Sequence, residues 1–119
     1  MTWIELYKAY EEAKKNIKSL GYDIGPITEF CIHRRYRRAW AKCYRNNHEY
    51  TFRIGISDRL LNANPDSVKD TIYHEVIHTV DGCFNHGPCF KSVAEKCNDK
   101  FGRHISIQTS AQEMMHGKK

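Results

Sequence analysis

Hydrophobic side chains recur every three or four positions near the start of the chain, which is the spacing of one face of a helix. This pattern covers residues 3–20 and ends at Gly21. Thr2 lies just before this segment and Glu5 lies in its first turn. They form a capping-box pair, in which each side chain accepts a hydrogen bond from the backbone N–H of the other residue. The pattern predicts an N-terminal helix over residues 3–20.

Apolar and polar residues alternate in the middle of the chain, with the two-residue period of a strand. The pattern predicts strands over residues 27–32, 36–45 and 49–57. Asn46 and Asn47 mark a turn between the last two. Strands joined this tightly pair antiparallel, so we predict a three-stranded antiparallel sheet.

Helical periodicity returns after the sheet. A short helical turn is expected at residues 58–63. Asn64 and Pro65 have the features of an N-cap and a first helical residue, which predicts a helix over residues 65–81. A further helix is expected over residues 88–101. The order of helix, sheet and helices indicates an α+β fold.

The overall composition is that of one globular domain. The chain has 119 residues, of which 40% are hydrophobic and 28% charged, so we expect a single domain over residues 1–119. No apolar run is long enough to span a membrane, and no secretory signal is visible. The five cysteines are odd in number and form no CxxC pair. We therefore expect reduced thiols in a cytoplasmic protein, or in one associated with the nucleoid or nucleus.

Positive charge is concentrated in one short segment. The formal net charge is +5, and residues 33–38 contain Arg34, Arg35, Arg37 and Arg38. One interpretation is a solvated strand edge or turn. The other is a surface that contacts substrate or nucleic-acid phosphates, which would make DNA a partner. The sequence leaves both open.

The expected helix at residues 65–81 contains the motif HEVIH at residues 74–78. His74 and His78 are four residues apart, so their imidazoles lie on the same helical face and can bind one Zn²⁺. Glu75 lies between them, close enough to act on a zinc-bound water. The alternative is a surface helix with two solvated histidines.

A catalytic zinc site usually has three protein ligands and one open position. The downstream side chains that can bind a metal are Asp81, Cys83, His86, Cys89 and Glu95. We favour His86, because it lies beyond Gly82, where the chain can turn back toward the motif. Asp81 could instead hydrogen-bond a ligand histidine. Glu95 also fits on the exposed face of the next helix.

Cys83 and Cys89 flank His86 with C-x2-H-x2-C spacing. Two thiolates added to the histidines would close the coordination sphere and prevent catalysis. The simpler interpretation is that both cysteines are small packing residues. A second hypothesis is that one of them contacts the metal reversibly and makes the site redox-sensitive.

Four segments together resemble one known family. They are residues 39–43 (AWAKC), 54–57 (IGIS), 71–78 (TIYHEVIH) and 86–91 (HGPCFK). An HExxH motif followed by HGxxF is far more specific than HExxH alone. Over residues 3–104 the chain is similar to the SprT-like metallopeptidases, which include the bacterial SprT proteins and the catalytic domain of the Spartan proteases.

The resemblance implies that His74, His78 and His86 bind one Zn²⁺ and that Glu75 is the catalytic acid/base. It also implies a compact, zincin-like domain of helices and a sheet. Many family members continue into a C-terminal zinc ribbon with paired CxxC motifs, and this sequence has none. Recognition of DNA structure is therefore not transferred to this chain.

These features predict a zinc-dependent metallopeptidase that hydrolyses peptide bonds of a protein or peptide substrate, with DNA-associated proteins as one candidate class. Glu75 would take a proton from the attacking water and pass it to the leaving amine. Candidates for a second donor to the developing oxyanion are Tyr36, Tyr44, Tyr50, Arg34, Arg35 and His104. One alternative is a DNA-binding module with a structural zinc site and no protease activity. Another is a metal-dependent hydrolase with a non-peptide substrate.

Overall fold

The computed structural model describes residues 1–34, 36 and 39–106. Within them a helix comes first, then a sheet, then further helices, so the predicted α+β class is confirmed. The elements are α1 (Trp3–Ser19), β1 (Ile27–His33), β2 (Ala41–Asn46), β3 (Thr51–Ser57), the 3-10 helix η1 (Asp58–Asn62), α2 (Pro65–Ile77) and α3 (Pro88–Phe101).

The helix α1 begins where the sequence predicts. The Thr2 side chain accepts a hydrogen bond from the Glu5 backbone N–H, and the Glu5 carboxylate accepts one from the Thr2 N–H. This capping box satisfies two backbone donors that the first turn would leave unpaired. The buried face of the helix consists of Leu6, Ala9, Tyr10, Ala13 and Ile17.

The sheet is mixed, with strand order β1-β3-β2. β2 and β3 are antiparallel, as predicted, but β1 pairs with β3 in parallel, so the fully antiparallel sheet is wrong in this respect. The burial of β3 accounts for the order: Phe52, Ile54 and Ile56 are buried, and Gly55 between them is buried too. A strand buried on both faces lies at the centre of a sheet, and the more polar β1 and β2 are its edges.

Two element boundaries also differ from the prediction. β2 begins at Ala41 instead of residue 36. α2 ends at Ile77 instead of residue 81, because the next backbone bonds run to the third residue back, as in Val80 N–H to the Ile77 carbonyl. Val80 then forms an isolated antiparallel bridge with Ile24. Pairing with the segment before β1 therefore replaces the last helical turn that periodicity predicts.

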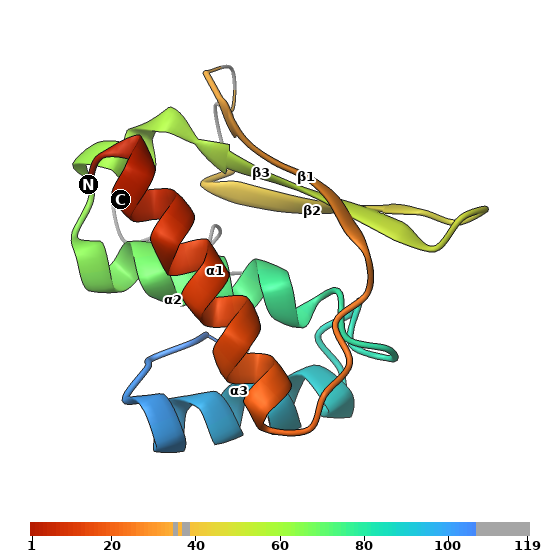
Figure 1. The fold of residues 1–119 in the computed structure, drawn as a ribbon. Coiled ribbons are helices and arrows are strands. Elements are labelled where there is room, and N and C mark those ends of the chain that lie inside the picture. Colours follow the sequence, from red (N-terminus) through yellow and green to blue (C-terminus); the bar gives the residue numbers. More distant parts are fainter. Residues whose placement is uncertain (35, 37–38, 107–119) are drawn as a thin grey trace.

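The elements form layers, with the helices below the sheet in Figure 1. α1 and α2 pack side by side against one face of the sheet, and α3 lies beyond them. Tyr10 of α1 stacks on Phe30 of β1 with ring centroids 4.0 Å apart, and this contact anchors α1 to the sheet. α2 lies in the middle of the molecule, so its inward residues are almost fully buried.

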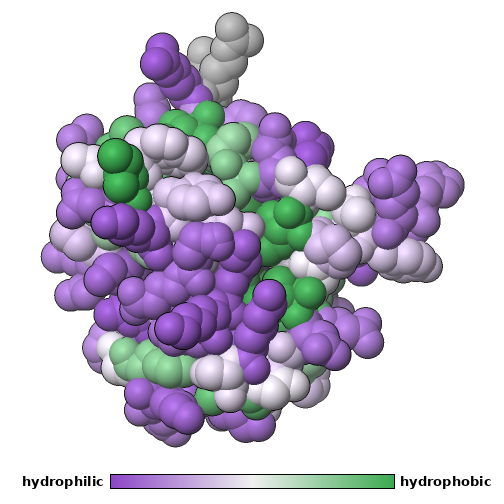
Figure 2. Space-filling model, in the orientation of Figure 1, coloured by the Kyte–Doolittle hydropathy of each residue, from purple (hydrophilic) through white to green (hydrophobic). Residues whose placement is uncertain are grey.

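The hairpin that joins β2 and β3 extends beyond the helical layer (Figure 1). In the space-filling view it forms a mostly hydrophilic projection from the body of the molecule (Figure 2). Within the described residues, no helix has the length and apolar character needed to cross a membrane.

Candidate metal centre

The helix α2 places the first two candidate ligands at its C-terminal end. Its start is fixed by Asn64, whose side-chain oxygen accepts hydrogen bonds from the backbone N–H groups of Asp66 and Ser67. His74 lies in the last turn and His78 is the C-cap residue. Both imidazoles are therefore on one face of the helix end, where the chain turns away and leaves room for a third group.

Three imidazoles converge at this point. Nε2 of His74 lies 3.2 Å from Nε2 of His78 and 3.1 Å from Nε2 of His86. The possible ligand atoms of the three residues all lie within 4.8 Å of one another. His86 is brought there by the loop between α2 and α3.

Hydrogen bonds at the opposite ring nitrogens orient two of these imidazoles. Nδ1 of His78 lies 3.1 Å from the Cys83 carbonyl oxygen, and Nδ1 of His74 lies 3.3 Å from the Ser106 carbonyl oxygen. A carbonyl can only accept, so each Nδ1 carries the proton and each Nε2 keeps its lone pair. Two lone pairs 3.2 Å apart repel each other unless a cation lies between them.

The spacing fits zinc. With Zn–N bonds of about 2.0–2.1 Å, tetrahedral ligand nitrogens are about 3.3–3.4 Å apart. The Nε2 atoms of His78 and His86 lie 3.2 and 3.1 Å from that of His74, which is close to this value. A neutral imidazole whose Nδ1 donates to a backbone carbonyl, as in His74 and His78, is also the usual form of a metal-ligating histidine.

Burial keeps the histidines neutral. The pKa of His74 is lowered to about 3, chiefly by burial and then by the neighbouring His78 and His86. The pKa of His78 is lowered to about 4, again chiefly by burial. Burial also lowers the pKa of His86. Neutral imidazole is the form that binds a metal, so the chain is ready to do so at neutral pH.

Phe90 is the common packing partner of the three imidazoles. Its ring centroid lies 4.7 Å from that of His74, 4.8 Å from His78 and 5.0 Å from His86. The side chain is fully buried in the first turns of α3. Hydrophobic periodicity does not reveal this role, although Phe90 is part of the HGxxF segment.

Glu75 follows His74 in α2 and is buried, with 5% of its surface exposed. Burial raises its pKa to about 8, because a carboxylate loses hydration in these surroundings. A carboxyl group with a raised pKa can both hold and release a proton near neutral pH. Glu75 directly follows His74 in α2, so the same helix carries this carboxyl group and two of the three imidazoles.

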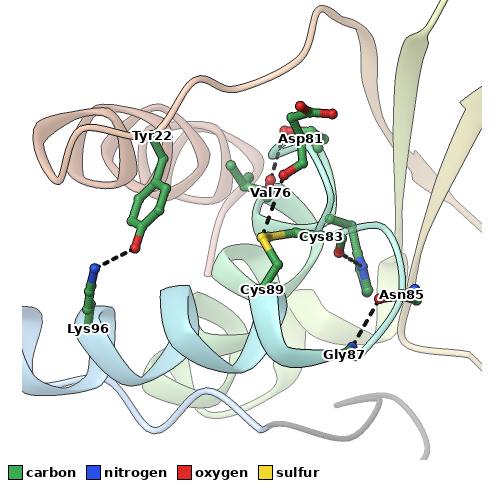
Figure 3. Close-up of a disulfide and its surroundings, with 10 residues drawn as sticks. Tyr22, Val76, Asp81, Cys83, Asn85, Gly87, Cys89 and Lys96 are labelled. Atoms are coloured by element: carbon green, nitrogen blue, oxygen red, sulfur yellow. Dashed lines mark hydrogen bonds between the residues drawn. A yellow bond between two sulfur atoms is a disulfide. The ribbon is translucent and has the colours of Figure 1, made fainter.

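Cys83 and Cys89 form a disulfide, with Cα atoms 5.2 Å apart (Figure 3). The prediction that all five cysteines are reduced thiols is therefore wrong for this pair. The chain reverses at Gly82, which has φ of +81°, and this turn brings the two residues into bonding range. Cys31, Cys43 and Cys97 remain free thiols. The bridge closes the loop that carries His86.

The alternatives to His86 lie outside the cluster. Asp81 and Glu95 are both exposed, and the group that could hold a metal ion in the described part of the chain consists of His74, His78 and His86. The sulfur atoms of Cys83 and Cys89 are bonded to each other, so neither is a thiolate here.

The basic segment is described only in part. Arg34 is exposed, whereas Arg35, Arg37 and Arg38 lie outside the described residues. Contact of this segment with DNA or substrate stays a prediction.

Among the candidate oxyanion donors, Tyr36 and Tyr44 are engaged with each other, with hydroxyl oxygens 2.9 Å apart. Burial and this contact raise the pKa of Tyr36. The His104 backbone N–H donates to the Asp70 carboxylate. Tyr50 lies in the β2–β3 hairpin and borders a cavity that reaches His78. The choice among these donors stays a prediction.

Comparison with known proteins identifies the family to which the chain belongs. No curated protein and no solved structure matches the chain. A family model described as the SprT-like family matches residues 5–113, a stretch that contains the whole histidine cluster and nearly all of the chain. The chain therefore belongs to the SprT-like family.

Proposed function

We propose that this protein is a zinc-dependent metallopeptidase that hydrolyses peptide bonds in protein substrates. The observation that carries the proposal is the convergence of three neutral imidazoles, one of which, His74, directly precedes a buried carboxyl group, Glu75, in the same helix. A structural zinc site has no use for such a carboxyl group. Membership of the SprT-like family supports the same reaction class.

His74, His78 and His86 would hold the metal through Nε2, since Nδ1 of the first two is occupied by carbonyl groups. Zn²⁺ bound there would polarise the peptide carbonyl and make water a nucleophile near neutral pH. Glu75 would accept the proton of that water and deliver it to the leaving amine. Its raised pKa suits both halves of this transfer.

A DNA-associated substrate is the finer part of the proposal. The net charge of +5 and the exposed Arg34 support it, because cationic side chains attract phosphate at low ionic strength. A DNA-binding module with a structural zinc is the competing function, and the same charge favours it. The cytoplasm, nucleoid or nucleus stays the proposed location.

The deciding experiment compares the wild type with Glu75→Gln, which keeps the shape of the side chain and loses its acid/base chemistry. Zinc per chain is measured together with cleavage of an unfolded protein substrate, with and without DNA. We expect equal zinc in both proteins and cleavage by the wild type alone. Cleavage at equal rates would remove Glu75 from its role.

Full zinc without cleavage by either protein would favour the structural-zinc alternative. Cleavage that depends on DNA and weakens with added salt would support the DNA-associated substrate class.

A further inference from the structure

A cavity of about 340 Å³ adjoins the candidate metal centre, and His78 is one of its lining residues. Its walls come from three segments: residues 23–26 before β1, residues 79–84 after α2, and the β2–β3 hairpin. His78 belongs both to the cluster of three histidines and to the wall of this cavity. A group inside the cavity therefore lies next to His78, one of the three candidate metal ligands of the proposed peptidase.

The inner part of the cavity is apolar. Phe52 and Val80 are buried, and Phe84 is half-buried with its ring centroid 6.0 Å from that of His78. The charged residues lie at the rim: Asp23 and Asp81 are exposed. The guanidinium group of Arg45 lies over the Phe84 ring, 4.5 Å from its centroid, and holds that ring in place.

Backbone contacts fix the walls relative to one another. The Gly25 N–H donates to the Thr79 carbonyl over 2.8 Å, and the Phe52 N–H donates to the Pro26 carbonyl over 2.8 Å. Gly25 has no side chain, and the Phe52 ring occupies the space that a Cβ there would need. The cavity is therefore formed before any ligand binds, which lowers the entropic cost of binding.

Tyr50 borders the mouth of the cavity in an unusual backbone conformation. Its φ is +55°, and its side chain is 69% exposed. The left-handed region is unfavourable for a bulky side chain and is often found at functional sites. Here it places an aromatic ring at the entrance.

We propose that this cavity binds one bulky apolar side chain of the substrate, at a position next to the scissile bond. The volume is near the lower end of the range for ligand sites, about 300–1,000 Å³, which suits a single side chain. The inference rests on the proposed peptidase function and names its specificity. Phe84 and Tyr50 are the specificity-determining residues, because the Phe84 ring lies beside His78 and the exposed Tyr50 borders the cavity.

Burial of a large apolar side chain in such a site raises kcat/KM by about tenfold or more over alanine. The first experiment is cleavage of a randomised peptide mixture by zinc-loaded protein, with cut sites identified by mass spectrometry. We expect Phe, Tyr, Leu and Met to be enriched on one side of the cut. Uniform sequence on both sides would overturn the proposal.

The variants Phe84→Ala and Tyr50→Ala should reduce this preference. In each variant, the frequency of large apolar residues beside the cut should be no more than about threefold that of alanine. Tyr7→Ala is the matched control, since Tyr7 is an exposed tyrosine on α1, outside the cavity. Zinc content is measured for each variant, so that a lost ligand is not mistaken for lost specificity. Unchanged enrichment in a zinc-loaded Phe84→Ala protein would overturn the proposal.

A binding measurement separates this inference from the peptidase function. N-acetyl-phenylalanine amide and N-acetyl-alanine amide are titrated into Glu75→Gln protein, and the backbone amide signals of Val80, Gly82 and Phe84 are followed by NMR. Saturable shifts with the phenylalanine probe, and none with the alanine probe, support the cavity as an apolar side-chain site. This result would hold even if the wild-type protein cleaved no peptide. Absence of such shifts overturns it, even where peptide is cleaved.

Discussion

Nδ1 of His78 donates a hydrogen bond to the backbone carbonyl of Cys83 over 3.1 Å, so a candidate metal ligand is oriented by the residue that begins a disulfide-bridged loop. The bridge to Cys89 closes that loop around His86. Two of the three imidazoles therefore depend on the same short segment. Figure 3 shows the bridge joining Cys89, in the first turn of α3, to Cys83 in the loop after α2, with the Cys89 Sγ directed toward the Asp81 carbonyl.

Reduction of the Cys83–Cys89 bridge is expected to weaken zinc binding. A dithiol reductant opens the bridge to two thiols and is itself oxidised to a disulfide. The loop then gains conformational freedom, and the orientation of both His78 and His86 becomes less fixed. We expect a decrease in zinc affinity of about 10- to 100-fold, the usual effect of losing the support of a metal ligand. Competition with a chromogenic chelator measures it.

The double variant Cys83→Ser, Cys89→Ser should show the same weakening without reductant and no further change with it. Cys31→Ser is the control, because Cys31 is a free thiol on β1. Equal zinc affinity in the oxidised, reduced and double-variant proteins would show that the bridge has no influence on the metal site. The same assay on protein isolated under cytoplasmic redox conditions would report which form exists there.

Removal of the third imidazole is expected to abolish stable zinc binding. His86→Ala should retain only a small fraction of the roughly one zinc per chain expected for a three-histidine site. Asp81→Ala, at an exposed position on the same loop, should retain all of it. Elemental analysis after dialysis measures both. Loss of zinc in Asp81→Ala with retention in His86→Ala would reverse the assignment of the third ligand.

Phe90→Ala is expected to be strongly destabilising. Phe90 is fully buried and packs on all three imidazoles. Deleting a buried aromatic ring costs about 3–5 kcal/mol in the free energy of unfolding, because a cavity remains. Phe90→Leu should cost less than about 1.5 kcal/mol. Urea unfolding of the metal-free proteins measures both, and equal stability of the two variants would contradict the packing role.

The metal-free protein is expected to lose stability on acidification. The pKa values of His74 and His78 are about 3 and 4 in the folded chain, whereas an unfolded histidine has a pKa near 6.5. Between about pH 6.5 and 4 the unfolded chain therefore binds protons that the folded chain does not. The free energy of unfolding therefore decreases by up to about 1.4 kcal/mol per histidine for each pH unit of acidification.

Glu75 has the opposite effect, since its pKa is raised to about 8 in the folded chain. Its contribution is present at acid pH and is lost as the pH rises toward 8. Measurements on Glu75→Gln protein therefore isolate the contribution of the histidines to the pH dependence of stability. There, His78→Asn should flatten the decrease in stability between pH 6.5 and 4, and His48→Asn, at an exposed turn residue, should not. A decrease unaffected by His78→Asn would contradict the assignment.

Features that depend on nearby residues could be predicted from the sequence. The capping box of Thr2 and Glu5 and the N-cap at Asn64 are local hydrogen-bonding patterns, and both occur where predicted. The pairing of His74 with His78 follows from the helical repeat. Convergence of His86 with them depends on the fold, yet the HGxxF segment indicated it.

Features that depend on distant parts of the chain could not be predicted in the same way. β3 lies between β1 and β2, in keeping with its burial on both faces, and therefore pairs with β1 in parallel as well as with β2 antiparallel. Hydrophobic alternation along each strand does not report this order. The end of α2 at Ile77 depends on Ile24, more than fifty residues earlier in the chain. The carbonyl groups that orient His74 and His78 belong to the backbone, so no side-chain pattern reveals them.

The contact between Gly25 and Phe52 has a consequence for how this protein can vary. A methyl group at position 25 would meet the Phe52 ring and approach the Thr79 carbonyl oxygen to 2.9 Å. Gly25→Ala is therefore expected to be tolerated better together with a smaller residue at position 52 than alone, which is a non-additive pair in a double-mutant cycle. Variant libraries that aim to change the adjoining cavity should randomise positions 25 and 52 together. Most single substitutions at either position would disturb the packing of this pair, and that disturbance would mask any change in substrate preference.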